Sequence, residues 1–296
     1  MTTVALTDGL GNRMFQYAFG YALKKQGLKV LYDDVHYKRR TDCTWEFVDL
    51  KEIFPNLDIS YTAWWNFYFT FPKKYKSFPK RLFNRLMLKS QLESVVKGPS
   101  LHYVPEIMKK AKRNTLFYGH WQSEQYFADC RDEILEQFTF LPFSERQNID
   151  LAKQMKKENS VAIHIRKGED YYRWKSTHGI CDADYYKKAI DYIKKTVSNP
   201  VFYVFTDNIP WVMENLATTD IRLVDWNPLK GRYNFRDMQL MSCARHNIIA
   251  NSTYSWWGAW LNTNPTKIVI APKEWVNNLD PKLQNNDVVP ESWVRL

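Results

Sequence analysis

The residues best suited to chemistry follow three predicted strands in the second half of the chain. His164 and Arg166 lie at the end of the first strand, Asp207 follows the second, and the segment 251–258 follows the third. In open α/β sheets, ligands bind beyond the carboxyl ends of the strands. We therefore expect these three strand ends to converge on one binding site.

The third of these segments opens a predicted helix at 254–261. It carries four polar residues, Asn251, Ser252, Thr253 and Ser255. Their oxygens can cap the helix, and an ordinary capped helix is one interpretation. The backbone N–H groups at a helix start also carry partial positive charge and bind phosphate. Because the guanidinium of Arg166 matches phosphate oxygens bidentately, its presence at a neighbouring strand end favours a diphosphate site.

A resident metal ion or cofactor is not predicted. Asp182 and Asp184 match the D-x-D pattern that other sugar transferases use for manganese, but Asp184 lies just before a predicted helix at 185–195. An N-cap aspartate is expected at such a position. The histidines form no H-x-x-x-H pair and the cysteines no C-x-x-C pair. We therefore expect Arg, Lys and helix N-termini to neutralise the charge of a departing diphosphate.

The N-terminal region predicts a strand at 3–7, a helix at 13–26 and a strand at 28–32. Together these elements form a βαβ unit, which is the building block of a parallel sheet. Gly9 and Gly11 provide a tight G-x-G turn between the first strand and the helix.

A dinucleotide-binding site is one alternative for this turn. Asp33 and Asp34 end the second strand, where such sites carry an acidic residue, so an NAD(P)-dependent oxidoreductase is a second functional hypothesis. Met14 occupies the position of the third glycine and blocks the close approach of helix and strand that glycine permits. No phosphate-binding P-loop sequence occurs in the chain.

From Ser160 onward, strands and helices alternate. Strands are predicted at 161–165, 201–206, 221–224, 247–250 and 267–271, and helices at 184–195, 235–244 and 254–261. This alternation is typical of a doubly wound parallel sheet. The polar segment 153–159 is a candidate linker. We therefore predict an α/β protein with two Rossmann-like halves facing a cleft, and with domains at 1–155 and 156–296.

Composition narrows the class of protein without identifying its ligand. The chain has 296 residues, 16% of them aromatic, and a net charge of +10. Aromatic rings stack on sugars and bases, although packing accounts for most of them. The positive charge attracts anions, so a non-catalytic glycan- or polyanion-binding module is a third hypothesis. The N-terminus has no signal peptide, no segment is apolar enough to span a membrane, and the cysteines are scattered, so we expect a cytoplasmic protein.

Residues 64–97 combine aromatic and basic side chains. Six Trp, Tyr and Phe residues lie between 64 and 71, and eight Lys and Arg residues accompany Glu93 between 73 and 97. An amphipathic basic helix beside aromatic residues suits a membrane interface. A solvated helix that covers the first domain is one interpretation of this segment, and peripheral contact with the inner face of the cell membrane is the other.

Three segments together resemble glycosyltransferase family 11, the α-1,2-fucosyltransferases. Residues 9–18, GLGNRMFQYA, match the opening block of that family, and residues 164–168, HIRKG, match its H-x-R-R-G-D-Y block. Residues 251–261, NSTYSWWGAWL, match its third block almost completely, and residues 119–127 resemble a segment of bacterial members. The chain departs from the family pattern at three positions, where Asp8 replaces glycine, Arg13 replaces glutamine and Lys167 replaces arginine.

This resemblance implies a GT-B-like fold and transfer of L-fucose from GDP-β-L-fucose, without a metal ion and with inversion at the anomeric carbon. The implied acceptor is the 2-hydroxyl of a terminal β-galactose on a glycan, with a lipid-linked oligosaccharide as one example and no role for nucleic acid.

The resemblance also implies roles for individual residues. Arg166 and His164 would contact the diphosphate and the sugar, while Asn12 and the Gly9–Gly11 loop would approach from the other half. Of the third block, Ser252, Thr253 and Ser255 would meet the β-phosphate, and Asn251 is a further candidate for binding GDP-fucose.

Further roles fall to carboxylates. Asp207 and Asp237 are candidates for contacts with guanine or ribose, and Glu169 or Asp170 for removing the proton of the acceptor hydroxyl. A general base is dispensable if the sugar cation forms readily once the leaving group is held.

Overall fold

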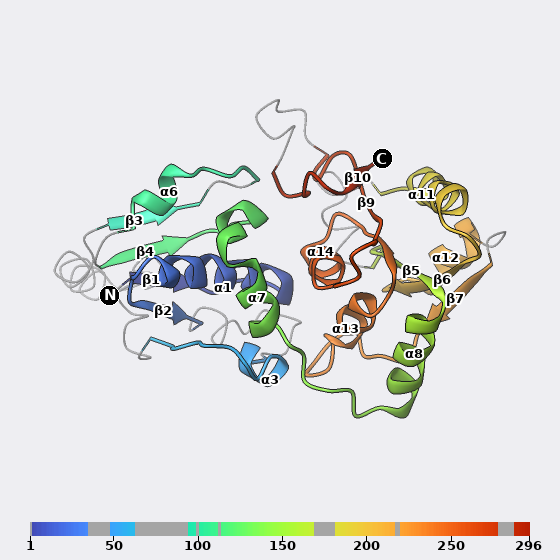
Figure 1. Ribbon diagram of the computed structural model, residues 1–296, viewed down its shortest axis with the longest axis horizontal. Coiled ribbons are helices and arrows are strands. Elements are labelled where there is room, and N and C mark those ends of the chain that lie inside the picture. The colour runs from blue at the N-terminus through green and yellow to red at the C-terminus, as the bar shows by residue number, and fades with distance from the viewer. Residues whose placement is uncertain are drawn as a thin grey trace, which may run out of the picture. The chain divides into compact units, whose positions relative to one another are not determined.

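The computed structural model describes residues 2–34, 48–62, 94–98, 101–111, 114–168, 181–216, 220–277 and 287–296. The chain divides into two compact units, Met1–Thr139 and Phe140–Leu296. Figure 1 colours the first unit from blue to green and the second from green to red. Each unit contains its own parallel sheet with helices packed against it. This architecture confirms the predicted class, an α/β, GT-B-like fold with two Rossmann-like halves.

The first unit contains a four-stranded parallel sheet in the order β2-β1-β4-β3. Its strands are β1 (Thr2–Ala5), β2 (Val30–Asp33), β3 (Ser94–Lys97) and β4 (Thr115–Tyr118). The predicted βαβ unit is confirmed, and its helix α1 (Leu10–Lys25) lies along β1 and β2 (Figure 1). This helix begins three residues earlier than predicted, so Gly11 lies in its first turn.

Short helical segments complete the first unit. They are α3 (Leu50–Ile53), α6 (Glu106–Lys109), two 3₁₀ turns (Glu124–Tyr126 and Ala128–Cys130) and α7 (Arg131–Gln137). Neither these segments nor strands β3 and β4 were predicted from the sequence.

Helix α1 packs closely on β2 because Gly20 has no side chain. A Cβ atom at this position would lie 2.7 Å from Cε1 and Oη of Tyr32. The Tyr32 ring stacks on Tyr17, with 5.2 Å between centroids, and its hydroxyl donates to the backbone carbonyl of Tyr17 at 3.0 Å. These contacts hold the ring in place and fix the position of α1. Gly9 is the N-cap residue of this helix, and Gly11 and Asn12 lie in its first turn.

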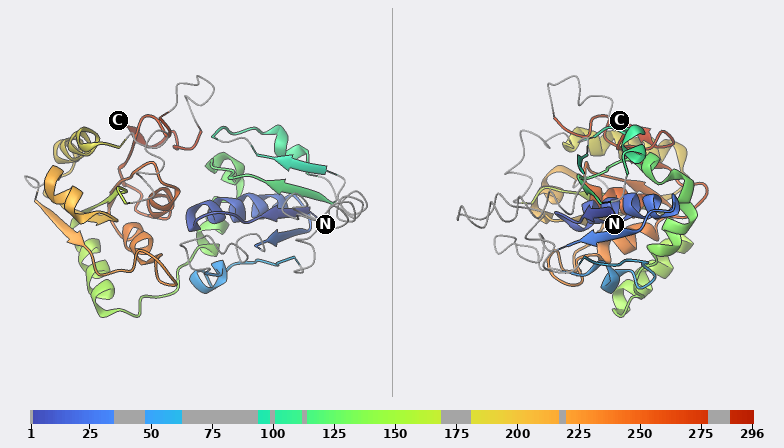
Figure 2. Two further views of the ribbon diagram at one scale, coloured as in Figure 1. Left: turned by 180° about the vertical axis from the view of Figure 1, so that it is seen from behind. Right: turned by 90° about the vertical axis from the view of Figure 1, so that its left-hand side faces the viewer.

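The second unit contains a six-stranded parallel sheet in the order β10-β9-β8-β5-β6-β7. Its strands are β5 (Asn159–Ile165), β6 (Pro200–Thr206), β7 (Ile221–Val224), β8 (His246–Ile248), β9 (Val269–Ala271) and β10 (Val294–Arg295). Its helices are α8 (Arg146–Lys157), α11 (Ala183–Thr196), α12 (Ile209–Leu216), α13 (Arg236–Ser242) and α14 (Thr253–Trp260). Helices α11 and α12 cover one face of the sheet, and α8, α13 and α14 cover the other (Figures 1 and 2).

Strand β5 shows why both faces are covered. Val161, Ile163 and Ile165 are fully buried in a cluster with α11 and α12. The alternate residues point to the other face, where the ring of His164 lies 5.7 Å from the ring of Tyr254 in α14. Because successive strand residues face opposite sides, a strand buried on both sides is apolar almost throughout.

The segment 153–159, predicted as a linker, belongs to regular elements. It contains the last turns of α8 and the start of β5. Met155 is fully buried, and its carbonyl accepts a hydrogen bond from the Ser160 hydroxyl at 2.6 Å. The predicted boundary between residues 155 and 156 thus falls within α8, whereas the units divide after Thr139.

Two further expectations concern single segments. Asp182, rather than Asp184, caps α11, accepting a hydrogen bond from the backbone N–H of Tyr185 at 2.9 Å.

Of residues 64–97, the structure describes only the stretch from 94 onward, which is β3, so the predicted basic helix lies outside the described residues. Within the described part of the chain, no helix has the length and apolar character needed to cross a membrane.

We predict that Gly20→Ala destabilises the protein. Its methyl group would overlap the Tyr32 ring, and overpacking of this kind costs about 1–3 kcal/mol of unfolding free energy. Denaturant titration measures the change. In a Tyr32→Leu background the ring is absent, so the cost of Gly20→Ala should be smaller; equal costs in both backgrounds would refute the assigned contact.

Candidate functional site

The structure brings the three predicted strand ends to one edge of the second sheet. Strand β5 lies between β6 and β8, and all three run parallel. The chain proceeds from β5 outward through β6 to β7 and then crosses to β8 on the opposite side of β5. The strand order therefore reverses between β5 and β8, the position at which open α/β sheets bind ligands.

The loop after β5 is held by Asp207, the first residue after β6. Its Oδ1 atom accepts a hydrogen bond from the backbone N–H of Lys167 at 2.6 Å, and Asn208 Nδ2 donates to the Lys167 carbonyl at 2.8 Å. A Cβ atom on Gly168 would lie 2.7 Å from Asp207 Oδ2, so a larger residue there would displace the Asp207 carboxylate. Asp207, predicted to contact guanine or ribose, thus has a structural role in this loop.

The environment of the Asp207 carboxylate is consistent with that role. The residue is exposed as a whole, but its carboxyl group is partly shielded, and this desolvation raises its pKa. The hydrogen bond from Lys167 and the nearby charge of Arg166 oppose that effect. Lys167 itself is buried, with Nζ 5.0 Å from the centroid of the Trp211 ring. The Lys167 side chain is therefore turned into the second unit.

Arg166 is half-buried, and its guanidinium makes no hydrogen bond or ion pair with any residue that the structure describes. It lies near enough to His164 and Asp207 to affect the pKa of both. A guanidinium without a local carboxylate partner is suited to bind an anion, because its planar fork matches two phosphate oxygens.

His164 is a neutral imidazole in this arrangement. Burial, and secondarily the charge of Arg166, lowers its pKa to about 3. The residue is half-buried overall, yet Nδ1 is fully buried and has no hydrogen-bond partner among the described residues. A buried polar atom without a partner is uncommon and marks a position that a ligand or water can satisfy.

The start of α14 supplies the opposing side of this edge. Ser252 is the N-cap residue but makes no side-chain cap hydrogen bond, contrary to the expected capped helix. Ser255 is buried, and its hydroxyl donates to the Ser252 carbonyl at 3.2 Å. Thr253 is half-buried at the first helical position. The backbone N–H groups of this first turn therefore remain available to an anion.

Asn251 positions the turn before α14 instead of pointing to a ligand. Its Nδ2 atom donates to the carbonyl of Trp275 at 3.1 Å, and its Oδ1 atom accepts a hydrogen bond from the Cys181 thiol at 3.4 Å. The residue is buried. These contacts give Asn251 a positioning role, and its contact with GDP-fucose stays a prediction.

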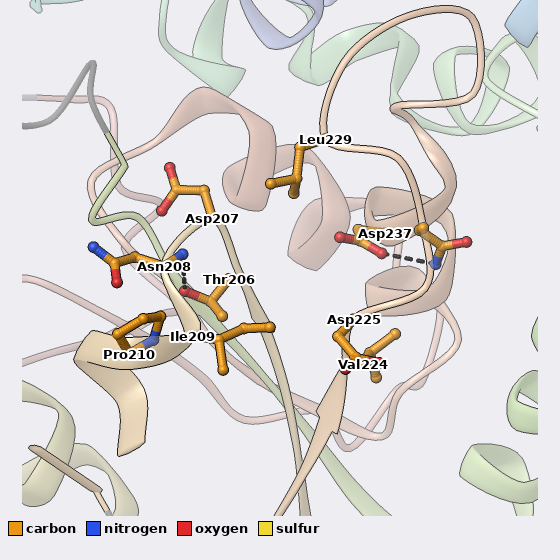
Figure 3. Close-up of a pocket in the computed structure, with 10 residues that line it drawn as sticks. Thr206, Asp207, Asn208, Ile209, Pro210, Val224, Asp225, Leu229 and Asp237 are labelled. Carbon is orange, nitrogen blue, oxygen red and sulfur yellow. Dashed lines mark hydrogen bonds between the residues drawn. The ribbon is translucent and has the colours of Figure 1, made fainter. Parts of the chain in front are cut away.

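A pocket of about 260 Å³ lies beside the β5 loop, at the carboxyl ends of β6 and β7 (Figure 3). Asp207 and Asp237 lie on opposite sides of it, and Ile209 and Leu229 add apolar surface. Burial raises the pKa of Asp237 to about 6, against the effect of a 2.8 Å hydrogen bond from Asn227. The pocket thus combines carboxylates with an apolar wall.

Two residues of this pocket, Asp225 and Asn227, were missed by the sequence analysis. Asp225 is the first residue after the strand predicted at 221–224, and Asn227 is the third. The expectation that ligands bind beyond the carboxyl ends of strands could therefore have identified them.

The remaining predicted site residues lie elsewhere. Gly9 is the N-cap residue of α1, and Gly11 and Asn12 lie in the first turn of this helix, in the first unit. Asn12 Oδ1 accepts a hydrogen bond from Gln122 Nε2 at 2.8 Å. Glu169 and Asp170 lie outside the described residues. Where the structure describes the chain, no three His, Cys, Asp or Glu side chains are grouped to hold a metal ion.

Comparison with known proteins gives consistent matches along the chain. The model of glycosyl transferase family 11 matches residues 1–296. An α-1,2-colitosyltransferase of Escherichia coli is 34% identical over 98% of this chain and 97% of that protein. The O-antigen biosynthesis glycosyltransferase WbnK of Escherichia coli is 32% identical over 98% and 99%. The galactoside 2-alpha-L-fucosyltransferase Sec1 of Mus musculus is 27% identical over 51% and 43%.

We predict that His164 remains neutral as the pH falls to 5. Its pKa of about 3 in the folded state lies below the ordinary value of 6.5, so the unfolded chain takes up the proton first. The stability associated with neutral His164 is therefore complete above about pH 6.5 and is lost as the pH falls toward 3.

The ¹⁵N chemical shifts of labelled histidine measure this titration directly. Arg166→Ala should raise the pKa only in part, because burial is the larger cause. A His164 midpoint above pH 5 in the unsubstituted protein would contradict the prediction.

Proposed function

Because this chain belongs to glycosyl transferase family 11, we propose that it transfers L-fucose from GDP-β-L-fucose to a galactoside. The reaction would invert the anomeric carbon and form an α-1,2 linkage to the 2-hydroxyl of a terminal β-galactose. One observation carries the proposal: Arg166, which has no carboxylate partner among the described residues, and a helix start without a side-chain cap lie where the strand order of the second sheet reverses. The family match gives no support to an NAD(P)-dependent oxidoreductase.

The diphosphate of GDP fits this edge of the sheet. Negative charge grows on the β-phosphate as the bond between the sugar and the phosphate oxygen breaks. Arg166 and the N–H groups at the start of α14 would stabilise that charge without a metal ion. His164, being neutral, would satisfy its buried Nδ1 atom through a hydrogen bond with the donor substrate or a water molecule.

The nucleoside of GDP fits the pocket at β6 and β7. Guanine N–H groups and ribose hydroxyls are hydrogen-bond donors, and Asp225 and Asp237 provide acceptors for them. Ile209 and Leu229 provide an apolar surface for the flat face of the base. Since the pKa of Asp237 is about 6, its carboxylate is largely ionised at neutral pH and accepts hydrogen bonds there.

The two units would then have separate tasks. We assign the GDP-sugar to the second unit and the acceptor to the first, with Gly9, Gly11 and Asn12 at the start of α1 on the acceptor side. Glu169 and Asp170 follow the β5 loop and are candidates for the proton-accepting group. By analogy with the WbnK relative, named for O-antigen biosynthesis, a lipid-linked oligosaccharide at the inner membrane face is a fitting acceptor.

Colitose is a second candidate for the transferred sugar. The Escherichia coli relative that is 34% identical over nearly the full length of both chains is named an α-1,2-colitosyltransferase. Colitose is L-fucose without the 3-hydroxyl group, so both donors present the same diphosphate and the same anomeric carbon. The two activities differ only in whether the enzyme accepts a donor sugar with or without the 3-hydroxyl group.

A donor and acceptor panel tests the proposed function. The protein would be incubated with GDP-fucose or GDP-colitose and a series of β-galactosides, in EDTA and in Mn²⁺, and product linkages assigned by NMR. We expect an α-1,2 product in EDTA. The absence of transfer with either donor would overturn the proposal, and activity that is lost in EDTA and restored by Mn²⁺ would overturn its metal-free part.

We predict that Arg166→Ala lowers kcat/KM by at least tenfold and leaves the fold intact. A charge-assisted hydrogen bond to phosphate contributes about 1.5–3 kcal/mol, and the effect on rate is larger where charge develops in the transition state. Arg166→Lys should restore little activity, because lysine lacks the planar fork.

Arg245→Ala is the matched control for Arg166→Ala. Arg245 is exposed and lies just before β8, at the opposite end of the same sheet, so its removal changes the net charge equally. Its kcat/KM should stay near that of the unsubstituted enzyme. If Arg166→Ala kept more than about a tenth of kcat/KM, which corresponds to about 1.4 kcal/mol, Arg166 would have no role at the diphosphate.

A further inference from the structure

The first unit has its own point of strand-order reversal, and polar side chains meet there. Strand β1 leads through α1 to β2 on one side, whereas β4 lies on the other side of β1 and follows β3. The loops after β1 and β4 are therefore adjacent at the carboxyl edge of this sheet. The first loop contains Asp8, and the second contains His120.

Asp8 and His120 form a hydrogen-bonded pair across these loops. His120 Nε2 lies 2.9 Å from Asp8 Oδ2, which also accepts a hydrogen bond from the Thr7 hydroxyl at 3.0 Å. The side chains of His120 and Asp8 are 43% and 41% exposed. With the ring proton on Nε2, Nδ1 is an acceptor that makes no hydrogen bond with any residue in the described ranges. The pair is accessible to a ligand, yet its geometry is fixed.

The buried side chain of Gln16 fixes the two loops beneath this pair. Its Oε1 atom accepts a hydrogen bond from the backbone N–H of Thr7 at 2.7 Å. Its Nε2 atom donates to the Thr7 hydroxyl and to the Gly119 carbonyl, both at 2.9 Å. Gln16 thus joins the residue before Asp8 to the residue before His120.

Backbone strain is concentrated at the same place. Asp8 has φ of 65° and Trp121 has φ of 54°, both in the left-handed region that favours glycine. Trp121 is fully buried and stacked on Phe19, with 4.2 Å between centroids, so its conformation is imposed by packing. Strained residues of this kind cluster at sites where a side chain must be held in a set position.

We propose that these loops bind the acceptor sugar and that His120 receives the proton of the attacking hydroxyl, an inference that rests on the proposed transferase function. As the acceptor oxygen bonds to the anomeric carbon, the bond from that carbon to the phosphate oxygen breaks and its electron pair leaves with the nucleotide. The hydroxyl proton moves to Nδ1 of His120. Asp8 is the positioning residue, which orients the ring and stabilises the imidazolium.

A second polar pair completes the acceptor site. Gln122 Nε2 donates to Asn12 Oδ1 at 2.8 Å, joining the loop after β4 to the first turn of α1. Both residues are half-buried, and Asn12 Nδ2 and Gln122 Oε1 make no hydrogen bond elsewhere in the described ranges. One acceptor therefore lies on the loop that carries His120 and one donor on the facing first turn of α1, as the recognition of neighbouring sugar hydroxyls requires.

Three variants test the catalytic part of the proposal. His120→Ala should lower kcat of transfer roughly 100-fold, as expected for loss of a general base, and leave GDP affinity unchanged. Added imidazole should restore part of this activity. Glycine suits the left-handed backbone at position 8, so Asp8→Gly should melt at or above the temperature of the unsubstituted protein, while kcat falls about 10- to 100-fold. The kcat of Asp8→Asn should fall at least as far, because a neutral amide does not stabilise the imidazolium and can donate to Nε2, which leaves the ring proton on Nδ1.

A purely structural pair would behave differently. His120→Ala would then lower the melting temperature, keep more than a third of kcat and show no imidazole rescue, and Asp8→Gly would keep full activity; either result overturns the proposal. The proposal also fails if Glu169→Gln or Asp170→Asn reduces kcat more than His120→Ala does.

Binding of lactose separates this inference from the proposed function. The ¹⁵N signals of His120 should shift when lactose is titrated into the unsubstituted protein, whether or not any donor is present. If His120 shifts but neither fucose nor colitose is transferred, the proposed donor is wrong and the acceptor site stands. If transfer occurs but lactose leaves the His120 signals unchanged, the proposed function stands and this inference is overturned.

Discussion

Asp207 accepts a hydrogen bond from the backbone N–H of Lys167, and the rest of the second unit's site is arranged around that contact. It fixes the loop that follows β5 and thereby the point from which Arg166 extends. Glycine at residue 168 leaves room for this contact, since a methyl group there would overlap the Asp207 carboxylate. The contact also depends on the sheet. Parallel pairing of β5 with β6 brings Lys167 and Asp207 together, although they are 40 residues apart in the sequence.

The two units solve the same geometrical problem with different chemistry. In each, polar residues gather where the strand order reverses, because only there do two adjacent loops diverge and leave room for a ligand. The second unit places a cation and a helix start at this point, which suits a leaving group that gains negative charge. The first unit places an Asp–His pair and two amides there, which suits an uncharged, hydroxyl-rich ligand.

Much of this arrangement could be predicted from the sequence, because it depends on local patterns. Apolar runs of five and six residues followed by polar residues identified β5 and β6, and the βαβ pattern identified α1, although its start was placed three residues late. Strand β3 was missed because it lies at the edge of its sheet and its residues are only half-buried or exposed; β4 is as short as the predicted β1 and β2, and its local pattern alone did not identify it. The prediction of a linker at the end of α8 was wrong. Only one side of that helix, with Leu151 and Met155, is buried, so most of its last residues are polar. The roles of Asp207 and Asn251 depend on contacts distant in sequence, which no local pattern encodes.

The left-handed backbone at Asp8 has an evolutionary consequence. Glycine and aspartate codons differ by a single base at the second position, so one transition mutation converts one residue into the other. At most positions such a change would disturb the backbone, but at a φ of 65° glycine is unstrained and aspartate is among the best-tolerated alternatives. A carboxylate can therefore be gained or lost beside His120 in one mutational step at little cost to folding. This position is one where natural selection can adjust the chemistry of the first unit independently of its architecture.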